Sequence, residues 1–265
     1  MHAADALEAI LKRDRALVLG GLAFLSVLAW AATAQMARTL PHGHSVAAPV
    51  PGLTLPHAGA WGGAELTILF VMWAVMMAAM MLPSTAPMVL VFSTISRKQA
   101  GMGDPVVPAA AFLAGYVLVW TGFSALGTLA QWALQRMAWL TPAGESASPF
   151  FGGILLLMAG VFQWTPWKEA CLSKCRSPLG FLMTRWRRGT GGALRMGLEH
   201  GAFCVGCCWA LMALMFVAGM MNLLWLAVLA IFCLLEKVVP AGRLVRHLSA
   251  TGLIAWGLYL ITLGV

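Results

Sequence analysis

The sequence predicts an all-α, polytopic transmembrane helix bundle of about seven spans, with the N-terminus inside and the C-terminus outside. Of the 265 residues, 61% are hydrophobic and only 10% are charged, whereas a soluble globular protein carries about 25% charged residues. A run of about 20 apolar residues crosses the hydrocarbon core of a membrane as a helix. The apolar runs here are continuous and do not alternate, so they favour helices over a closed β-barrel.

Seven apolar segments justify this count, at 16–36, 65–92, 106–135, 150–166, 197–219, 223–238 and 247–264. With the N-terminus inside, all of the 17 basic residues except Arg38 and Arg136 fall on the inner side. Inner loops of membrane proteins are enriched in Lys and Arg, so the distribution predicts a multi-pass protein of the cell inner membrane. The net charge of +8 therefore reflects orientation, and we expect a lipid bilayer as partner and no nucleic acid.

We expect a single membrane domain, residues 1–265. Residues 1–64 are predicted to form an anchor helix and an outer loop with His42, His44 and His57, which either collect a metal ion or have no role. Residues 65–265 are predicted to form the core bundle. Within it, residues 167–196 are predicted to form an inner basic loop that contains cysteines. The first span also resembles a signal peptide, because "ATAQ" at 32–35 follows a charged start and an apolar run. Cleavage there would leave six spans.

The stretch "HGAFCVGCCW", residues 200–209, clusters His200, Cys204, Cys207 and Cys208 at the inner end of the fifth span. At about 100° per residue, the three cysteines lie within about 80° of His200 on one helix face. Thiols near the cytoplasm stay reduced, so structural disulfides are not expected. Soft thiolates bind Cu(I) and also zinc. The pattern predicts a site for a soft metal, most simply Cu(I), with zinc possible and helix packing through small residues as the alternative.

Two further groups extend this predicted site. Cys171 and Cys175 are one helical turn apart in the inner loop, where they would cap the site or exchange ligands with it. Met76 and Met80 recur on one face of the second span. Methionine commonly fills gaps in apolar cores, but beside thiols it also provides thioether ligands for Cu(I).

Three blocks resemble an uncharacterised bacterial family of predicted metal-binding integral membrane proteins, sometimes labelled copper chaperones. They are "MWAVMMAAMMLPSTAPM", "QWTPWKEACLSKCRSP" and "GLEHGAFCVGCCWALM", and the resemblance extends from about residue 65 to the C-terminus. It implies a helical membrane fold that handles metal. The residues in this chain that match its motifs are Met76, Met77, Met80, Met81, Pro83, Trp167, Lys168, Cys171, Cys175, His200, Cys204, Cys207 and Cys208.

Three functions are compatible with these residues. The first is Cu(I) handling near the cytoplasmic face, with delivery to a soluble metallochaperone or a membrane metalloenzyme. The second is a membrane thiol oxidoreductase, in which Cys204 and Cys207 exchange electrons with a quinone or a soluble dithiol. The third is a non-catalytic scaffold subunit. The sequence has no P-loop, dinucleotide fingerprint or G-x-S-x-G motif, which excludes an ATP-driven pump within this chain and favours a function other than catalysis.

Overall fold

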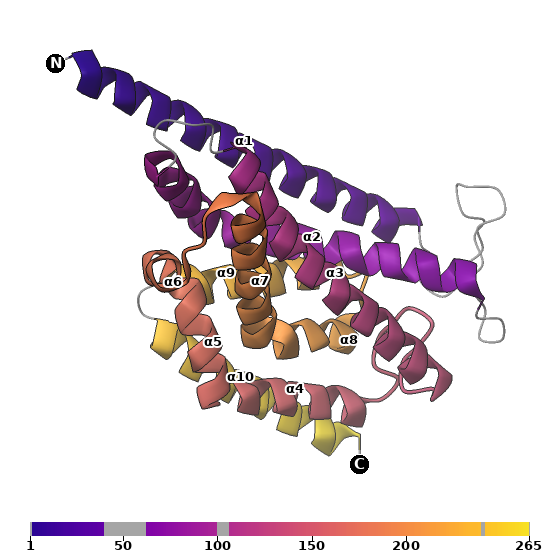
Figure 1. The fold of residues 1–265 in the computed structure, drawn as a ribbon. Coiled ribbons are helices and arrows are strands. Elements are labelled where there is room, and N and C mark those ends of the chain that lie inside the picture. The colour runs from indigo at the N-terminus through magenta and orange to yellow at the C-terminus, as the bar shows by residue number, and fades with distance from the viewer. Residues whose placement is uncertain (1, 40–61, 100–105, 240–241, 265) are drawn as a thin grey trace.

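The computed structural model describes residues 2–39, 62–99, 106–239 and 242–264, and these residues fold into a helical bundle without a β-strand (Figure 1). The predicted outer-loop residues His42, His44 and His57 lie outside the described residues. The helices are α1 His2–Thr39, α2 Gly63–Gln99, α3 Val106–Arg136, α4 Pro149–Gln163, α5 Pro166–Arg176, α6 Pro178–Arg185, α7 Gly189–Ala213, α8 Met215–Ala218, α9 Leu223–Val238 and α10 Gly242–Leu263.

The segment predicted as an inner loop, 167–196, is mostly helical. Two short helices, α5 and α6, occupy most of it, and α7 begins at Gly189. Both short helices start with proline, after Thr165 and Ser177, whose hydroxyls accept hydrogen bonds from backbone N–H groups of the first turn. A hydroxyl cap followed by proline is a strong helix-start signal, and it outweighs the polar composition that suggested a loop.

Five helices of the described ranges are long and apolar enough to cross a membrane: α1, α2, α3, α7 together with α8, and α10. The pair α4 and α5 meets the same criteria only jointly, with a bend of 66° between them. Helix α9 has 16 residues, which span about 24 Å, less than the ~30 Å hydrocarbon core. The all-helical, multi-pass membrane architecture is thus confirmed with five or six candidate spans, and the seventh span and the orientation stay predictions.

The helices pack in pairs around α7, with α4 and α10 antiparallel and α3 and α7 parallel (Figure 1). Helices α1 and α2 lie side by side along one edge, α4 and α10 along the other, and α7 packs on α3 between them. Glycines permit the close approaches, because small residues let membrane helices come together. A Cβ atom added at Gly197 of α7 would collide with the backbone of Phe112 in α3, and one at Gly153 of α4 would come 2.7 Å from the carbonyl oxygen of Gly257 in α10.

The centre of the bundle is rich in sulfur. One cluster of buried side chains joins α2, α7, α8 and α9, and its sulfur-containing members are Met72, Met76, Met77, Met80, Met81, Cys204, Cys207, Cys208, Met212, Met215, Met220 and Cys233. A second, more aromatic cluster adjoins it and contains Met88, Phe92, Phe112 and Phe181. Cys204, Cys207 and Cys208 therefore lie inside the protein and do not face lipid.

Candidate functional site

Helix α7 presents its three cysteines to the core. Cys204, Cys207 and Cys208 are each only 1% exposed. The contact between α3 and α7 at Gly197 fixes the rotation of α7, and the three-to-four-residue spacing keeps the cysteines on the inward face. The sulfur atoms are thus gathered by one helix in a region that excludes water.

Cys204 is the residue on which most of the polar contacts converge. The Lys237 ammonium, from α9, donates a hydrogen bond to Cys204 Sγ over 3.1 Å, and the Tyr116 hydroxyl, from α3, lies 3.1 Å from the same sulfur. Lys237 also donates to Ser84 Oγ of α2 over 2.8 Å. Cys204 therefore lies where four helices meet, and its sulfur accepts at least one hydrogen bond from a charged donor.

Cys207 and Cys208 are arranged differently from Cys204. Their thiols both donate to the backbone carbonyl of Cys204, over 3.1 and 2.8 Å. Such bonds back to the preceding helical turn are common for short polar side chains. They hold the two sulfurs against their own helix, so a metal at this site would require both thiols to rotate away from the carbonyl.

The two cysteines of α5 reach the cysteines of α7, which spacing alone could not establish. Cys175 lies close enough to Cys204 and Cys207 for its thiol to interact with both. Cys171 lies beside Gly206, where an added Cβ would come 2.8 Å from Cys171 Sγ. Both α5 cysteines are partly exposed, so they connect the buried thiols with the surface. From α9, Cys233 interacts with Cys208.

Charged contacts hold α5 in place. Lys168 Nζ donates to Glu236 Oε2 over 2.7 Å, and both side chains are buried, at 0% and 2% exposed. Arg176 Nε donates to the backbone carbonyl of Glu236 over 2.7 Å, and Glu169 pairs with Arg246 of α10. Helix α5 is thereby attached to α9 and α10 on either side of its two cysteines.

His200 is buried but lies among aromatic rings. Its ring is 5.6 Å from Tyr116, 5.6 Å from Phe181 and 5.9 Å from Phe112, measured between ring centroids. Among the described residues, its buried Nδ1 atom has no hydrogen-bond partner. The imidazole lies one helical turn before Cys204 on α7.

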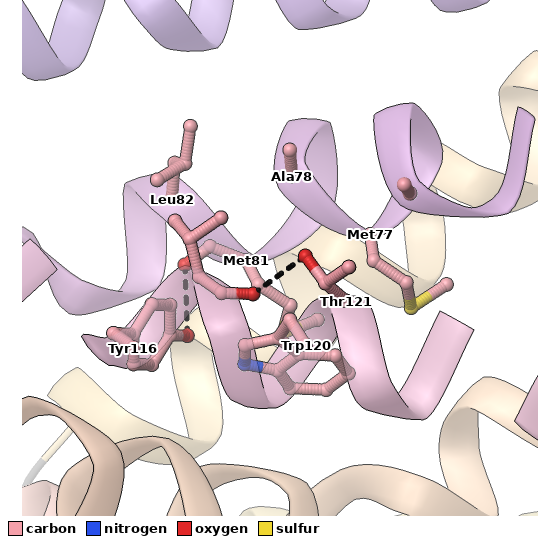
Figure 2. Close-up of a pocket in the computed structure, with 9 residues that line it drawn as sticks. Met77, Ala78, Met81, Leu82, Tyr116, Trp120 and Thr121 are labelled. Carbon is pink, nitrogen blue, oxygen red and sulfur yellow. Dashed lines mark hydrogen bonds between the residues drawn. The ribbon is translucent and has the colours of Figure 1, made fainter. Parts of the chain in front are cut away.

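Met76 and Met80 are buried in the sulfur-rich cluster together with the cysteines. Their neighbours Met77 and Met81 line a small pocket between α2 and α3, shown in Figure 2. Tyr116 also lines that pocket, and its hydroxyl donates to the Met81 carbonyl over 3.2 Å or to Cys204. Tyr116 thus separates the pocket from the thiols.

The donor set fits a soft monovalent metal in chemical type. Five cysteines, a histidine and several thioethers occupy a water-poor region, and such ligands favour Cu(I). In the described residues, however, no group of three or more His, Cys, Asp or Glu side chains is already placed to hold a metal ion. The inward hydrogen bonds of Cys207 and Cys208 explain why the thiols are gathered without forming a preassembled site.

Lys237 and Tyr116 belong to this cluster of contacts at Cys204, but they are not among the residues predicted from the sequence. Lys237 was read only as one of the inner basic residues that set orientation. A signal existed, because Lys237 follows Cys233 by one helical turn and ionisable groups inside membrane segments are commonly functional. Tyr116 is one of only two tyrosines in the chain and lies in the middle of a predicted span.

Comparison with known proteins adds one positive finding. A family model described as PpoB2, copper chaperone, matches residues 70–260, which include all the cysteines, Tyr116, Lys237 and both methionine groups. No curated protein and no solved structure matches the chain.

Proposed function

Because this chain belongs to the PpoB2 copper-chaperone family, we propose that it binds Cu(I) as cargo at a buried thiol site near the cytoplasmic face of a membrane and delivers it to a partner. The observation that carries this proposal is the convergence of Cys175 on Cys204 and Cys207. Thiols from two helices thus come within interaction range of one another, in a region where soft ligands predominate.

The proposed ligands divide by their burial. Cys204, Cys207 and Cys208 are the interior ligands, and Cys175 joins them from α5. Cys171, partly exposed beside Gly206, is the exchange ligand through which copper enters or leaves. His200, with its free Nδ1, together with Met76 and Met80, completes the set from neighbouring positions.

Loading requires changes in the thiols themselves. Cys207 and Cys208 rotate away from the Cys204 carbonyl, and the thiols that bind Cu(I) lose their protons to water, because thiolates are the ligands. Transfer between thiols proceeds through shared coordination at the α5 cysteines. A site that must rearrange to bind also releases its cargo more readily than a rigid one, which suits delivery.

The proposed orientation places the site at the cytoplasmic side of the inner membrane, with seven spans, the N-terminus inside and the C-terminus outside. Two turns support a common outer face: a Cβ at Gly144 would lie 3.2 Å from Met220 Sδ, and one at Gly219 would lie 2.9 Å from Glu145 Oε1. The α9 end that carries Lys237 and the α5 cysteines are on the opposite side. A soluble metallochaperone or a membrane metalloenzyme would there exchange copper with Cys171.

Metal analysis of purified protein tests the proposal. We expect the wild type to retain copper after exposure to Cu(I), and the Cys175→Ser/Cys204→Ser/Cys207→Ser variant to lose most of it. Cys233→Ser is the matched control, because it changes the same atom in a buried thiol that is not a proposed ligand. Equal copper in wild type and triple variant would refute the site, and zinc retained in place of copper would refute the metal.

One observation favours a second function, that of a membrane thiol oxidoreductase. The interactions of Cys204 with a lysine and with the thiols of Cys175, Cys207 and Cys208 are also the environment of a reactive dithiol. Alkylation and mass spectrometry test this function. A disulfide between Cys204 and either Cys175 or Cys207 that forms and disappears as a quinone is turned over would establish an oxidoreductase. Thiols that stay alkylatable under the same conditions would exclude it.

A further inference from the structure

Lys237 is unusual for a lysine at the end of a membrane helix. Such lysines normally extend towards the interface and keep the ammonium in water. Lys237 lies in the last turn of α9 but turns inward, and only 8% of the residue is exposed. Its ammonium contacts Ser84 Oγ and Cys204 Sγ.

Within the part of the chain that the structure describes, the ammonium also has no carboxylate partner. Among the ion pairs between described residues, none includes Lys237, and the adjacent Glu236 pairs with Lys168 instead. Ser84 donates its own proton to the Met81 carbonyl, so its oxygen only orients the ammonium and does not neutralise it. A buried charge without a counter-charge is costly, and the hydrogen-bond partners of this one among the described residues are the Ser84 hydroxyl and the Cys204 thiol.

We propose that Lys237 is a specificity-determining residue that selects a monovalent over a divalent metal at the thiol site. Cu(I) is held by two of the gathered thiols at a time, as thiolates, while the others stay protonated, and this complex carries one net negative charge, which the ammonium neutralises. The same two thiolates that hold Zn(II) are already neutral, so the ammonium would leave an uncompensated positive charge in a water-poor interior. The inference rests on the proposed thiol site and adds to it the source of its charge selectivity.

Ser84 supports this assignment as a positioning residue. Its hydroxyl accepts from Lys237 over 2.8 Å and donates to Met81 over 2.9 Å, which fixes the ammonium at 3.1 Å from Cys204 Sγ. Three helices, α2, α7 and α9, thus place the charge beside the sulfur. A lysine that served only to set orientation would need none of these contacts.

Competition binding in detergent with Cu(I) alone and with Zn(II) alone tests the proposal, using wild type, Lys237→Met, Lys237→Arg and Ser84→Ala. We expect Lys237→Met to lower Cu(I) affinity at least tenfold and to leave Zn(II) affinity equal or higher. The ratio of Cu(I) to Zn(II) affinity should therefore fall. Lys237→Arg keeps the positive charge and is expected to retain the preference for Cu(I). Ser84→Ala is expected to weaken this preference partly. Circular dichroism and gel filtration confirm that each variant is folded.

The outcomes separate the two proposals. If Lys237→Met binds Cu(I) and Zn(II) with the same ratio of affinities as the wild type, the charge selectivity is refuted while the thiol site stands. If Lys237→Met does not fold, the other two variants decide. The charge selectivity is refuted if Ser84→Ala leaves the ratio of Cu(I) to Zn(II) affinity unchanged and Lys237→Arg, which keeps the charge, loses the preference for Cu(I). A wild type that binds neither ion refutes the thiol site and the selectivity together.

Discussion

Gly206 shows how a single missing side chain shapes the thiol site. It lies between Cys204 and Cys207 on α7, and the Cys171 sulfur occupies the space that a methyl group would fill. Glycine normally weakens a helix interior by about 1 kcal/mol relative to alanine. Its presence here is explained by the approach of α5, because only a residue without Cβ admits the Cys171 thiol at this position.

Gly206→Ala is therefore expected to displace Cys171 and raise its alkylation rate several-fold. The added methyl group would come 2.8 Å from Cys171 Sγ, closer than van der Waals contact allows. Peptide mass spectrometry after brief maleimide labelling measures the rate at this cysteine.

Gly122→Ala is the matched control for this substitution. Gly122 is also in a helix interior, but nothing lies within 4 Å of its added Cβ. We expect unchanged Cys171 labelling there and a small stabilisation, up to about 1 kcal/mol, from the better helix propensity of alanine. Equal Cys171 labelling in both variants would show that Gly206 does not seat this thiol.

At the scale of elements, α5 is the least apolar helix near the site, yet it is firmly attached. Its 11 residues are too few and too polar to be stable alone. The Thr165 cap and Pro166 start it, and the contacts of Lys168, Glu169 and Arg176 hold it against α9 and α10. Its two cysteines depend on this attachment, because nothing in its own sequence would direct them to α7.

Removal of one member of the buried Lys168–Glu236 pair is expected to destabilise the protein strongly. Lys168→Met leaves a buried carboxylate without a counter-charge, for which a loss of about 3–5 kcal/mol is typical. Lys168→Met/Glu236→Gln removes both charges and should lose clearly less. Thermal unfolding in detergent measures both.

Arg185→Met provides the comparison for this pair. The ion pair of Arg185 with Glu199 is 3.0 Å long, but the arginine side chain is 44% exposed. Exposed pairs contribute about 0–1 kcal/mol, so this variant should unfold close to the wild type. A Lys168→Met variant as stable as Arg185→Met would indicate that the buried pair does not anchor α5.

At the scale of the whole molecule, contacts between distant segments divide the bundle into two faces. The turn before α4 meets the turn before α9 through Gly144 with Met220 and Gly219 with Glu145. The thiols, Lys168, Glu236 and Lys237 gather toward the other face. The short α9 still extends from one face to the other. Its first residue follows the turn that contains Gly219 and Met220, and Lys237 in its last turn contacts Cys204.

Reporter fusions test this topology. We expect a periplasm-active reporter to work when it is fused after Asn222 or Gly264 and to fail after Ser177. If α9 does not cross, the fusion after Gly264 will behave like the one after Ser177. That result would remove one span and place the C-terminus inside.

Local sequence was enough to predict the helical membrane class, five of the seven apolar spans, and the placement of Cys204, Cys207 and Cys208 on one face of α7. These depend on local composition and helical periodicity, which a single chain displays directly. Only the tertiary structure decided that Cys175 reaches those cysteines and that Lys237 and Tyr116 meet at Cys204, because these contacts join residues 29 to 88 positions apart. The tertiary structure also places His200 among aromatic rings. Contacts of this range depend on how helices pack through glycines and buried charges, and no local pattern records that packing.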